Sequence, residues 1–268
     1  MLAPGLHFSK YRNLAIGFAM TGNAVGLLGT APFVMAAREF YGTRGFFIVL
    51  ACISIHQIVF GMMMRPSSLE LSIKRNRSPI ATNKSEKSSS VASAFAGYFK
   101  VCTTLSVSVL SLSFLIMCIS DYAIFIHLPN YCTYLGHSPM EASYLLSATG
   151  IASIFGRLMT GFAANIDGLN EMYLHSGSLI GIGIAAVLFP FYGKSYAGQM
   201  VLAVIFGFFF GTPFVTATPI NIKLVGLSNM AAALANELFM GGVGAIIGPV
   251  TTSEYIYSRL SISRTRIY

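Results

Sequence analysis

Three ionisable side chains stand well inside long apolar stretches of this 268-residue sequence: Arg157, Asp121 and Glu237. A charged side chain at the centre of a bilayer is costly, about 2.5 to 3.5 kcal/mol for an arginine on insertion scales. Such groups are therefore kept mainly where they face a protein interior or a watery cavity. The planar guanidinium of Arg157 offers two parallel N–H donors to a carboxylate, a geometry that lysine cannot match. The arginine thus predicts a binding site for a small organic anion.

The two acids have more than one interpretation. Asp121 and Glu237 could balance the charge of Arg157 when no anion is bound, or they could take up protons and couple proton movement to transport, because burial favours an uncharged carboxyl group. Each could equally be a protonated, hydrogen-bonded structural acid. Arg157 has an alternative as well, since a long stem can carry the guanidinium to the membrane surface. All three residues are candidate substrate-binding groups.

The composition indicates the setting of these side chains. The sequence is 54% hydrophobic and 10% charged, whereas soluble domains carry about 25% charged residues. Apolar stretches recur along nearly the whole chain, which predicts a polytopic membrane protein. Its spans should be helices, because isolated strands cannot satisfy their backbone groups in lipid. The all-α prediction places seven transmembrane helices at 13–37, 45–64, 111–135, 142–164, 173–192, 198–222 and 228–250.

The net charge of +8 does not point to nucleic acid, because the basic residues gather between apolar runs and form no basic face with interleaved aromatic residues. Most of the Lys and Arg residues outside the spans lie on the side of the amino terminus. The positive-inside rule therefore places the amino terminus and the loop at 67–100 in the cytosol, where the basic cluster of the loop could contact anionic lipid.

The spans fall into groups separated by one long polar segment. Residues 67–100 are rich in serine and lysine and show little periodicity, which is typical of a disordered linker.

The tail carries basic residues that an odd number of spans would leave outside, against the positive-inside rule. The predicted organisation is two spans in 1–66, a cytosolic linker and interfacial segment in 67–110, five spans in 111–250 and an atypical tail in 251–268.

Small residues recur at helical spacing in several of the spans. A stripe of this kind lets another helix approach closely, and a moving transporter would use the same close contacts as a static bundle. The stripes are Ala15, Ala19, Gly22 and Gly26 in the first span, Gly207 and Gly211 in the sixth, and Gly244 and Gly248 in the seventh.

Nothing in the sequence resembles a hydrolase triad, a phosphate loop or a metal-binding cluster. The GGVG run at 241–244 lies in an apolar stretch and lacks the following Lys and Ser or Thr of a phosphate loop. No nucleophile and base stand at a recognisable spacing, so the sequence does not favour an enzyme. We expect neither a cofactor nor a metal.

Several motifs follow one another in an order that has a known counterpart. HFSKYRNLAIGFAMTGNAVGLLGTAPF at 7–33 combines a basic cluster with LAxGxAxxGxxxG and a proline, EASYLLSATGIASIFGRLMTGFAAN at 141–165 contains Arg157, and LANELFMGGVGAIIGPV contains Glu237. YGTRGFF, MRP and GFFFG lie between or beside them in the same order. Together these stretches resemble helices five, six, eight, ten and eleven of the monocarboxylate transporters, a family of the major facilitator superfamily.

The resemblance implies part of a twelve-helix fold in which two six-helix halves rock about a central site. It implies helices five to eleven, without counterparts of helices one to four or of the twelfth. It also implies a secondary active or facilitative transporter of the plasma membrane that carries monocarboxylates such as lactate or pyruvate, often with a proton. An ancillary single-span membrane subunit is a further implied partner.

One departure from the family bears on proton coupling and on the substrate: Ser153 stands one turn before Arg157, where the best known members carry Asp.

Under the transporter hypothesis, Lys10 and Arg12 act at a cytosolic gate, although both residues could simply fix the topology. The alternative hypothesis is a truncated membrane protein or regulatory subunit that does not transport.

Overall fold

The computed structural model describes residues 11–63, 71, 97–166 and 168–265, and within these residues its secondary structure is helical, with no strand. This confirms the predicted all-α fold. The principal helices are α2 (Arg12–Met63), α5 (Leu105–Tyr134), α6 (Pro139–Ala163), α7 (Glu171–Tyr192), α8 (Tyr196–Phe210) and α9 (Thr212–Thr265).

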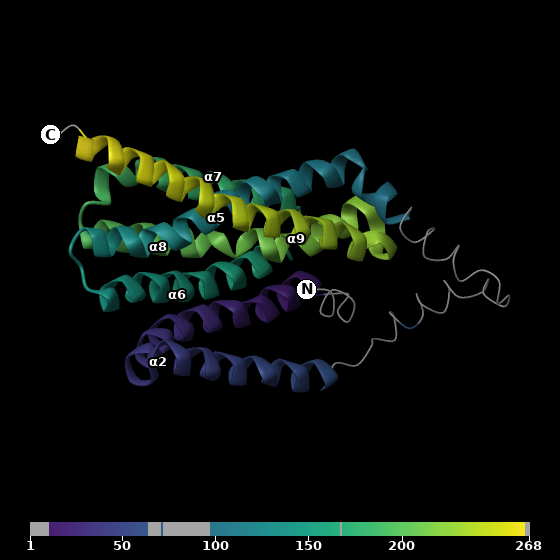
Figure 1. Ribbon diagram of the computed structural model, residues 1–268. Coiled ribbons are helices and arrows are strands. Elements are labelled where there is room, and N and C mark those ends of the chain that lie inside the picture. Colours follow the sequence, from purple (N-terminus) through teal and green to yellow (C-terminus); the bar gives the residue numbers. More distant parts are fainter. Residues whose placement is uncertain (1–10, 64–70, 72–96, 167, 266–268) are drawn as a thin grey trace. The chain divides into compact units, whose positions relative to one another are not determined.

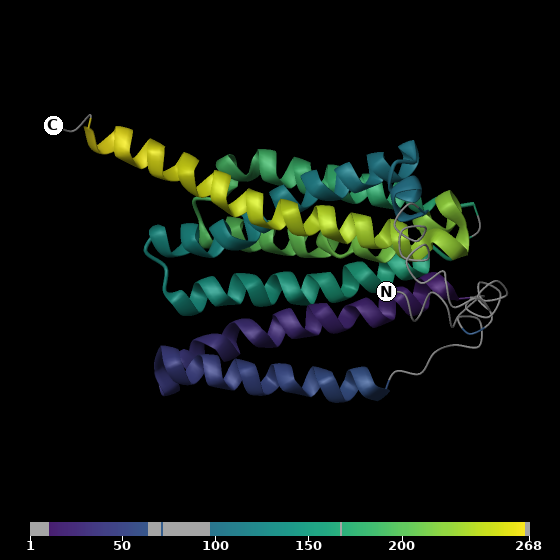
Figure 2. The same ribbon diagram turned by 45° about the vertical axis from the view of Figure 1, so that its right-hand side comes forward.

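Two glycines divide the longest helices. Gly42 in α2 has φ 63° and ψ −178°, and Gly226 in α9 has φ 75° and ψ 169°. These positive φ values are accessible to glycine without the steric cost that other residues incur. The chain of α2 turns back at Gly42, so that its two arms lie side by side (Figures 1 and 2). The two arms of α2 and the two parts of α9 on either side of Gly226 are counted separately here, and α8 is joined to the first part of α9. Counted in this way, the helices correspond to the seven predicted spans.

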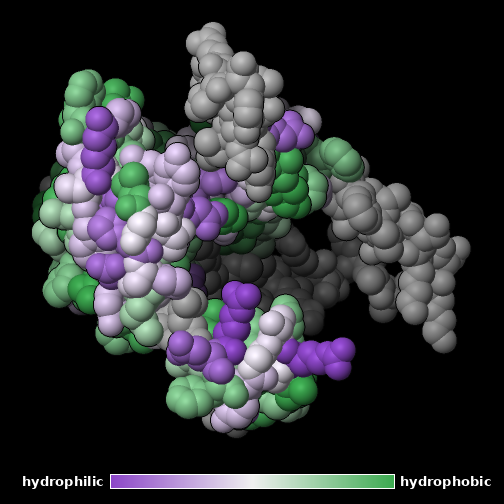
Figure 3. Space-filling view, turned by 60° about the vertical axis from the view of Figure 1, so that its left-hand side comes forward, coloured by the Kyte–Doolittle hydropathy of each residue, from purple (hydrophilic) through white to green (hydrophobic). Residues whose placement is uncertain are grey.

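The surface of the helices suits lipid. Five helical stretches in the described part of the chain are long and apolar enough to cross a membrane. Large apolar side chains such as Phe47, Ile116 and Phe191 are mostly exposed along them. Figure 3 shows a face on which hydrophobic side chains and groups of hydrophilic side chains are both present. The chain is an integral membrane protein.

The contacts divide the chain into two compact units, each built from two separate stretches of sequence. Unit 1 comprises Met1–Thr82 with Cys132–Pro219, and unit 2 comprises Asn83–Tyr131 with Ile220–Tyr268. Unit 1 contains α2, α6, α7, α8 and the first residues of α9. Unit 2 contains most of α5 and the remainder of α9.

In unit 1, α6 packs against the first arm of α2 through glycines (Figures 1 and 2). A Cβ on Gly17 would lie 2.8 Å from the carbonyl oxygen of Arg157 and 3.1 Å from Cα of Gly161. A Cβ on Gly150 would lie 2.8 Å from the backbone nitrogen of Leu28. These distances leave no room for a side chain, so the two backbones meet because the contact residues are glycines.

The stripe predicted in the first span is not this contact surface. Gly22 and Gly26 have open space where a Cβ would stand. The helix instead presents Gly17, Ala24 and Leu28 to α6. An apolar helix that is surrounded by lipid or protein on all sides shows no polar face from which the packed side can be read.

In unit 2, the predicted pair Gly244 and Gly248 does lie at a close helix contact, between α9 and α5. A Cβ on Gly244 would stand 3.1 Å from Cβ of Cys118, and one on Gly248 would stand 3.0 Å from Cα of Ile119.

Two helix boundaries differ from the predicted spans. The helix α5 begins at Leu105, before the predicted start at 111. The helix α9 runs on to Thr265, past the predicted end of the last span at 250. The sequence after residue 250 contains no Gly or Pro before Thr265, so nothing in it stops a helix. Most of the linker predicted in 67–110 lies outside the described residues.

Candidate functional site

The helix that carries Arg157 has a firmly defined start. Ser138 caps α6: its Oγ accepts a hydrogen bond from the backbone N–H of Glu141 at 3.2 Å, and Oε2 of Glu141 accepts one from the backbone N–H of Ser138 at 2.7 Å. Pro139 occupies the first turn. This capping box satisfies N–H groups that would otherwise lack partners at the helix end.

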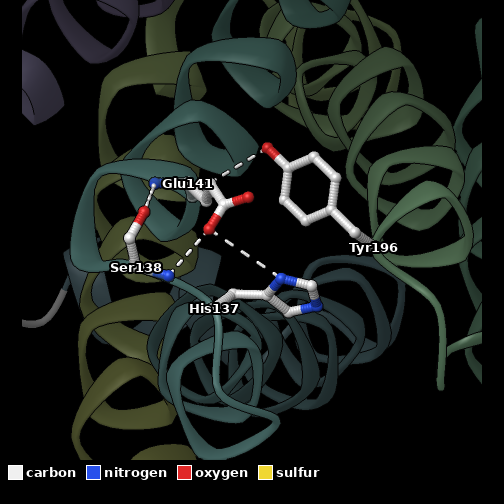
Figure 4. Close-up of polar contacts among 4 residues, drawn as sticks. All are labelled: His137, Ser138, Glu141 and Tyr196. Carbon is white, nitrogen blue, oxygen red and sulfur yellow. Dashed lines mark hydrogen bonds and ion pairs between the residues drawn. The ribbon is translucent and has the colours of Figure 1, made fainter.

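The same end of α6 is tied to the start of α8, as Figure 4 shows. The hydroxyl of Tyr196 donates to the backbone oxygen of Glu141 at 3.2 Å. Nδ1 of His137 lies 3.8 Å from Oε2 of Glu141, and the rings of His137 and Tyr196 are 5.2 Å apart. The register of α6 is thus fixed about five turns before Arg157.

Arg157 is buried, with 3% of its surface exposed. Its Nη1 donates a hydrogen bond of 2.8 Å to the backbone oxygen of Met20 in α2. Nε is buried without a hydrogen-bond partner in the described part of the chain. The side chain therefore reaches across to the neighbouring helix, and the alternative that it snorkels to the membrane surface does not describe this conformation.

Small polar side chains lie on the same side of α6 as the arginine. Thr160 Oγ1 donates to the backbone oxygen of Gly156 at 2.7 Å and lies 2.9 Å from Oγ1 of Thr212 in α9. Ser153 is fully buried, and its hydroxyl has no partner among the described residues. Hydroxyl groups on the same helix face as an arginine are suited to donate further hydrogen bonds to a bound carboxylate.

The two acids lie in unit 2. Glu237 is 0% exposed, and its Oε1 accepts a hydrogen bond of 2.8 Å from the side-chain amide of Asn221. Asp121 is 1% exposed, and its Oδ2 has no hydrogen-bond partner among the residues that the structure describes. Both acids are thus buried, as predicted. Arg157 belongs to the other unit, unit 1.

The residues predicted for a cytosolic gate lie at the start of the chain. Lys10 lies outside the described residues. Arg12 is the first residue of α2 and is half-buried. Its neighbour Asn13 donates 2.6 Å and 3.4 Å hydrogen bonds to the backbone oxygen of Ala164 and to Oε1 of Glu171. The start of α2 is therefore joined to the end of α6 and the start of α7.

Several residues around these groups were not predicted from the sequence. Thr160 could have been found, because it lies three residues after Arg157 on the same face of one helix. Met20 contributes a backbone oxygen, which any residue type could supply. Asn221 and Glu237 are separated by the bend at Gly226, which hides their proximity from any periodic pattern. Among the described residues no three His, Cys, Asp or Glu side chains are grouped to hold a metal ion.

Comparison with known proteins agrees with the helical arrangement. Residues 5–249 match the Major Facilitator Superfamily. The chain is 28% identical over 262 residues to monocarboxylate transporter 2 of Meriones unguiculatus, covering 94% of the chain and 54% of that protein. It is 27% identical over 258 residues to monocarboxylate transporter 12 of Xenopus laevis, covering 91% of the chain and 55% of that protein. The chain thus spans about half the length of these curated relatives. A match over so much of the sequence shows that the chain belongs to the Major Facilitator Superfamily.

Proposed function

We propose that the chain serves secondary active or facilitative transport of monocarboxylates or related small organic anions, and that Arg157 binds the carboxylate. The observation that carries this proposal is the environment of the guanidinium. It is buried, yet its one hydrogen bond within the described residues goes to a neutral backbone oxygen. A buried charge without a counter-charge is unfavourable, and a carboxylate offers both the opposite charge and a matching geometry.

The names of the relatives support the class of substrate. The proteins that the chain resembles are monocarboxylate transporters. A monocarboxylate such as lactate presents one carboxylate and a small remainder, which suits one arginine with hydroxyl groups on the same helix face. The plasma membrane is the proposed location, and an ancillary single-span membrane subunit is a proposed partner.

Proton coupling is part of the proposal, with Asp121 and Glu237 as the groups that take up protons. Both carboxyl groups are buried, and neither forms an ion pair with a described residue. Glu237 already accepts a hydrogen bond from an amide, which a neutral carboxyl group can also do. In this proposal Lys10 and Arg12 act at the cytosolic gate.

The test is uptake by the purified 268-residue chain in liposomes, with radiolabelled L-lactate and pyruvate as the probes. The proposal predicts saturable uptake that unlabelled pyruvate inhibits and that the neutral analogue lactamide does not. Protein-free liposomes give the background. Uptake equal to this background at every substrate concentration would contradict the proposal and favour the alternative, a non-transporting membrane protein or regulatory subunit.

A further inference from the structure

Gly211 ends α8 at the junction with α9, and its backbone conformation does not require glycine. Its φ is −80° and its ψ is −21°, in the right-handed helical region that every residue type adopts. Alanine at this position would cost nothing in backbone strain, and alanine is the better helix former. A reason for glycine must therefore come from the surroundings of the residue.

The space beside Gly211 is filled by the side chain of Arg157. A Cβ on Gly211 would collide with Cγ and Nε of the arginine and would lie 2.9 Å from its Cδ. These atoms form the middle of the side chain and not its free end. They cannot swing aside easily, because the tip of the same side chain is bonded to the Met20 oxygen at 2.8 Å.

Other glycines of these helices meet a different kind of neighbour. A Cβ on Gly207, one turn earlier in α8, would meet the backbone of Thr149, and a Cβ on Gly156 would meet the backbone of Phe208. Those two glycines allow α6 and α8 to approach. At Gly211, in contrast, all three nearest atoms belong to Arg157. The spacing of Gly207 and Gly211 suggests one common role, but their surroundings are different.

We propose that Gly211 is a positioning residue for Arg157, which it orients by leaving the space through which the arginine stem passes. The stem is confined at Gly211 and the tip is held at the Met20 oxygen, so that two contacts from two helices set the direction of the remaining N–H donors. This inference rests on the proposed function of Arg157 in carboxylate binding. Its steric part stands on the geometry alone.

The first test is the concentration dependence of L-lactate uptake by Gly211→Ala in liposomes, normalised to folded protein. A displaced guanidinium loses a charged hydrogen bond to the carboxylate, so KM should rise about tenfold or more. Gly177→Ala is the matched control, because no atom from another part of the protein lies within 4 Å of the added Cβ there, and it should leave KM unchanged. Gly207→Ala, which disturbs helix packing, should lower the yield of folded protein while the folded fraction keeps its KM.

The second test needs no transport. The Tm of the purified protein in detergent is measured for wild type, Gly211→Ala, Arg157→Ala and the double variant. Gly211→Ala should lower Tm when Arg157 is present and should leave it unchanged or raise it when residue 157 is alanine, because the colliding atoms are then gone.

Each outcome decides the inference. Equal shifts of Tm in both backgrounds would overturn the steric contact. A coupled Tm with an unchanged KM would show that Gly211 serves packing and does not position the guanidinium. If wild type itself shows no saturable uptake, the proposed function fails, while the Tm comparison still decides whether the arginine stem occupies the space beside Gly211.

Discussion

Arg157 brings a permanent charge into a buried position where it meets the backbone oxygen of Met20. A carbonyl oxygen compensates a positive charge less well than a carboxylate does, because the carbonyl carries no net negative charge and a carboxylate can accept two parallel N–H bonds. We therefore expect a monocarboxylate to be a stronger partner for the Arg157 guanidinium than the Met20 backbone oxygen is. In the proposed function, this difference favours the binding of an anion at this position.

Glu237→Gln tests proton uptake at the single-residue scale. The substitution keeps a side-chain oxygen that accepts the hydrogen bond from Asn221 but removes the titratable group. Exchange of labelled for unlabelled lactate should persist, while uptake stimulated by an inward proton gradient should fall to the rate measured without a gradient. Gradient-stimulated uptake at the wild-type rate would remove Glu237 from the coupling mechanism.

The sequence predicts the burial of Arg157, Asp121 and Glu237, but it predicts neither the neighbours of these residues nor the burial of Glu171. The burial of Arg157, Asp121 and Glu237 follows from charge inside a long apolar run, which is a local property. The Met20 oxygen and Gly211 reach Arg157 only through the crossing of helices. Such crossings depend on which faces pack together, and an apolar helix does not display its packed face in the sequence.

At the scale of the helices, the contact between α2 and α6 depends on glycine. Gly17→Ala places a Cβ 2.8 Å from a backbone oxygen of α6, so we expect a destabilisation of about 1 to 3 kcal/mol from overpacking. Gly22→Ala in the same helix is the control, because nothing lies near its added Cβ. Thermal unfolding in detergent should show a lower Tm for the first variant alone. Identical Tm values for the two variants would mean that the glycine contact contributes little.

The cap of α6 gives a second prediction at this scale. Ser138→Ala removes the oxygen that accepts the hydrogen bond from the Glu141 N–H, and loss of such a cap costs about 1 kcal/mol. Ser138→Thr retains a capping oxygen and serves as the control. The measurement is again Tm in detergent, with the alanine variant expected below wild type and the threonine variant close to it. An unshifted alanine variant would show that the remaining contacts of this helix end, made by the Glu141 carboxylate and the Tyr196 hydroxyl, are sufficient to hold it.

The helices themselves were largely predictable, whereas their bends and ends were less so. Apolar length predicts the spans because a membrane requires it of each helix separately. The bends at Gly42 and Gly226 coincide with gaps between predicted spans, where glycine permits the positive φ. The continuation of α9 to Thr265 was missed because hydropathy falls after residue 250, although polar residues can continue a helix outside the lipid.

At the scale of the whole molecule, the positive-inside rule predicts that the α6–α7 turn faces the cytosol and the α7–α8 turn faces outward. In a variant without the four native cysteines, Lys194→Cys should react with a membrane-impermeant maleimide in intact cells. Leu169→Cys should react only after permeabilisation. The reverse pattern would invert the topology and place Lys10 and Arg12 on the outside.

The central claim is that a monocarboxylate is held by the buried guanidinium, and the most direct measurement compares wild type with Arg157→Lys in matched liposomes. Lysine keeps the positive charge but loses the planar pair of donors. The account predicts that saturable L-lactate uptake disappears in Arg157→Lys while the protein remains folded, as judged by Tm and by size-exclusion chromatography. Uptake by the folded lysine variant with the KM and maximal rate of wild type would contradict it.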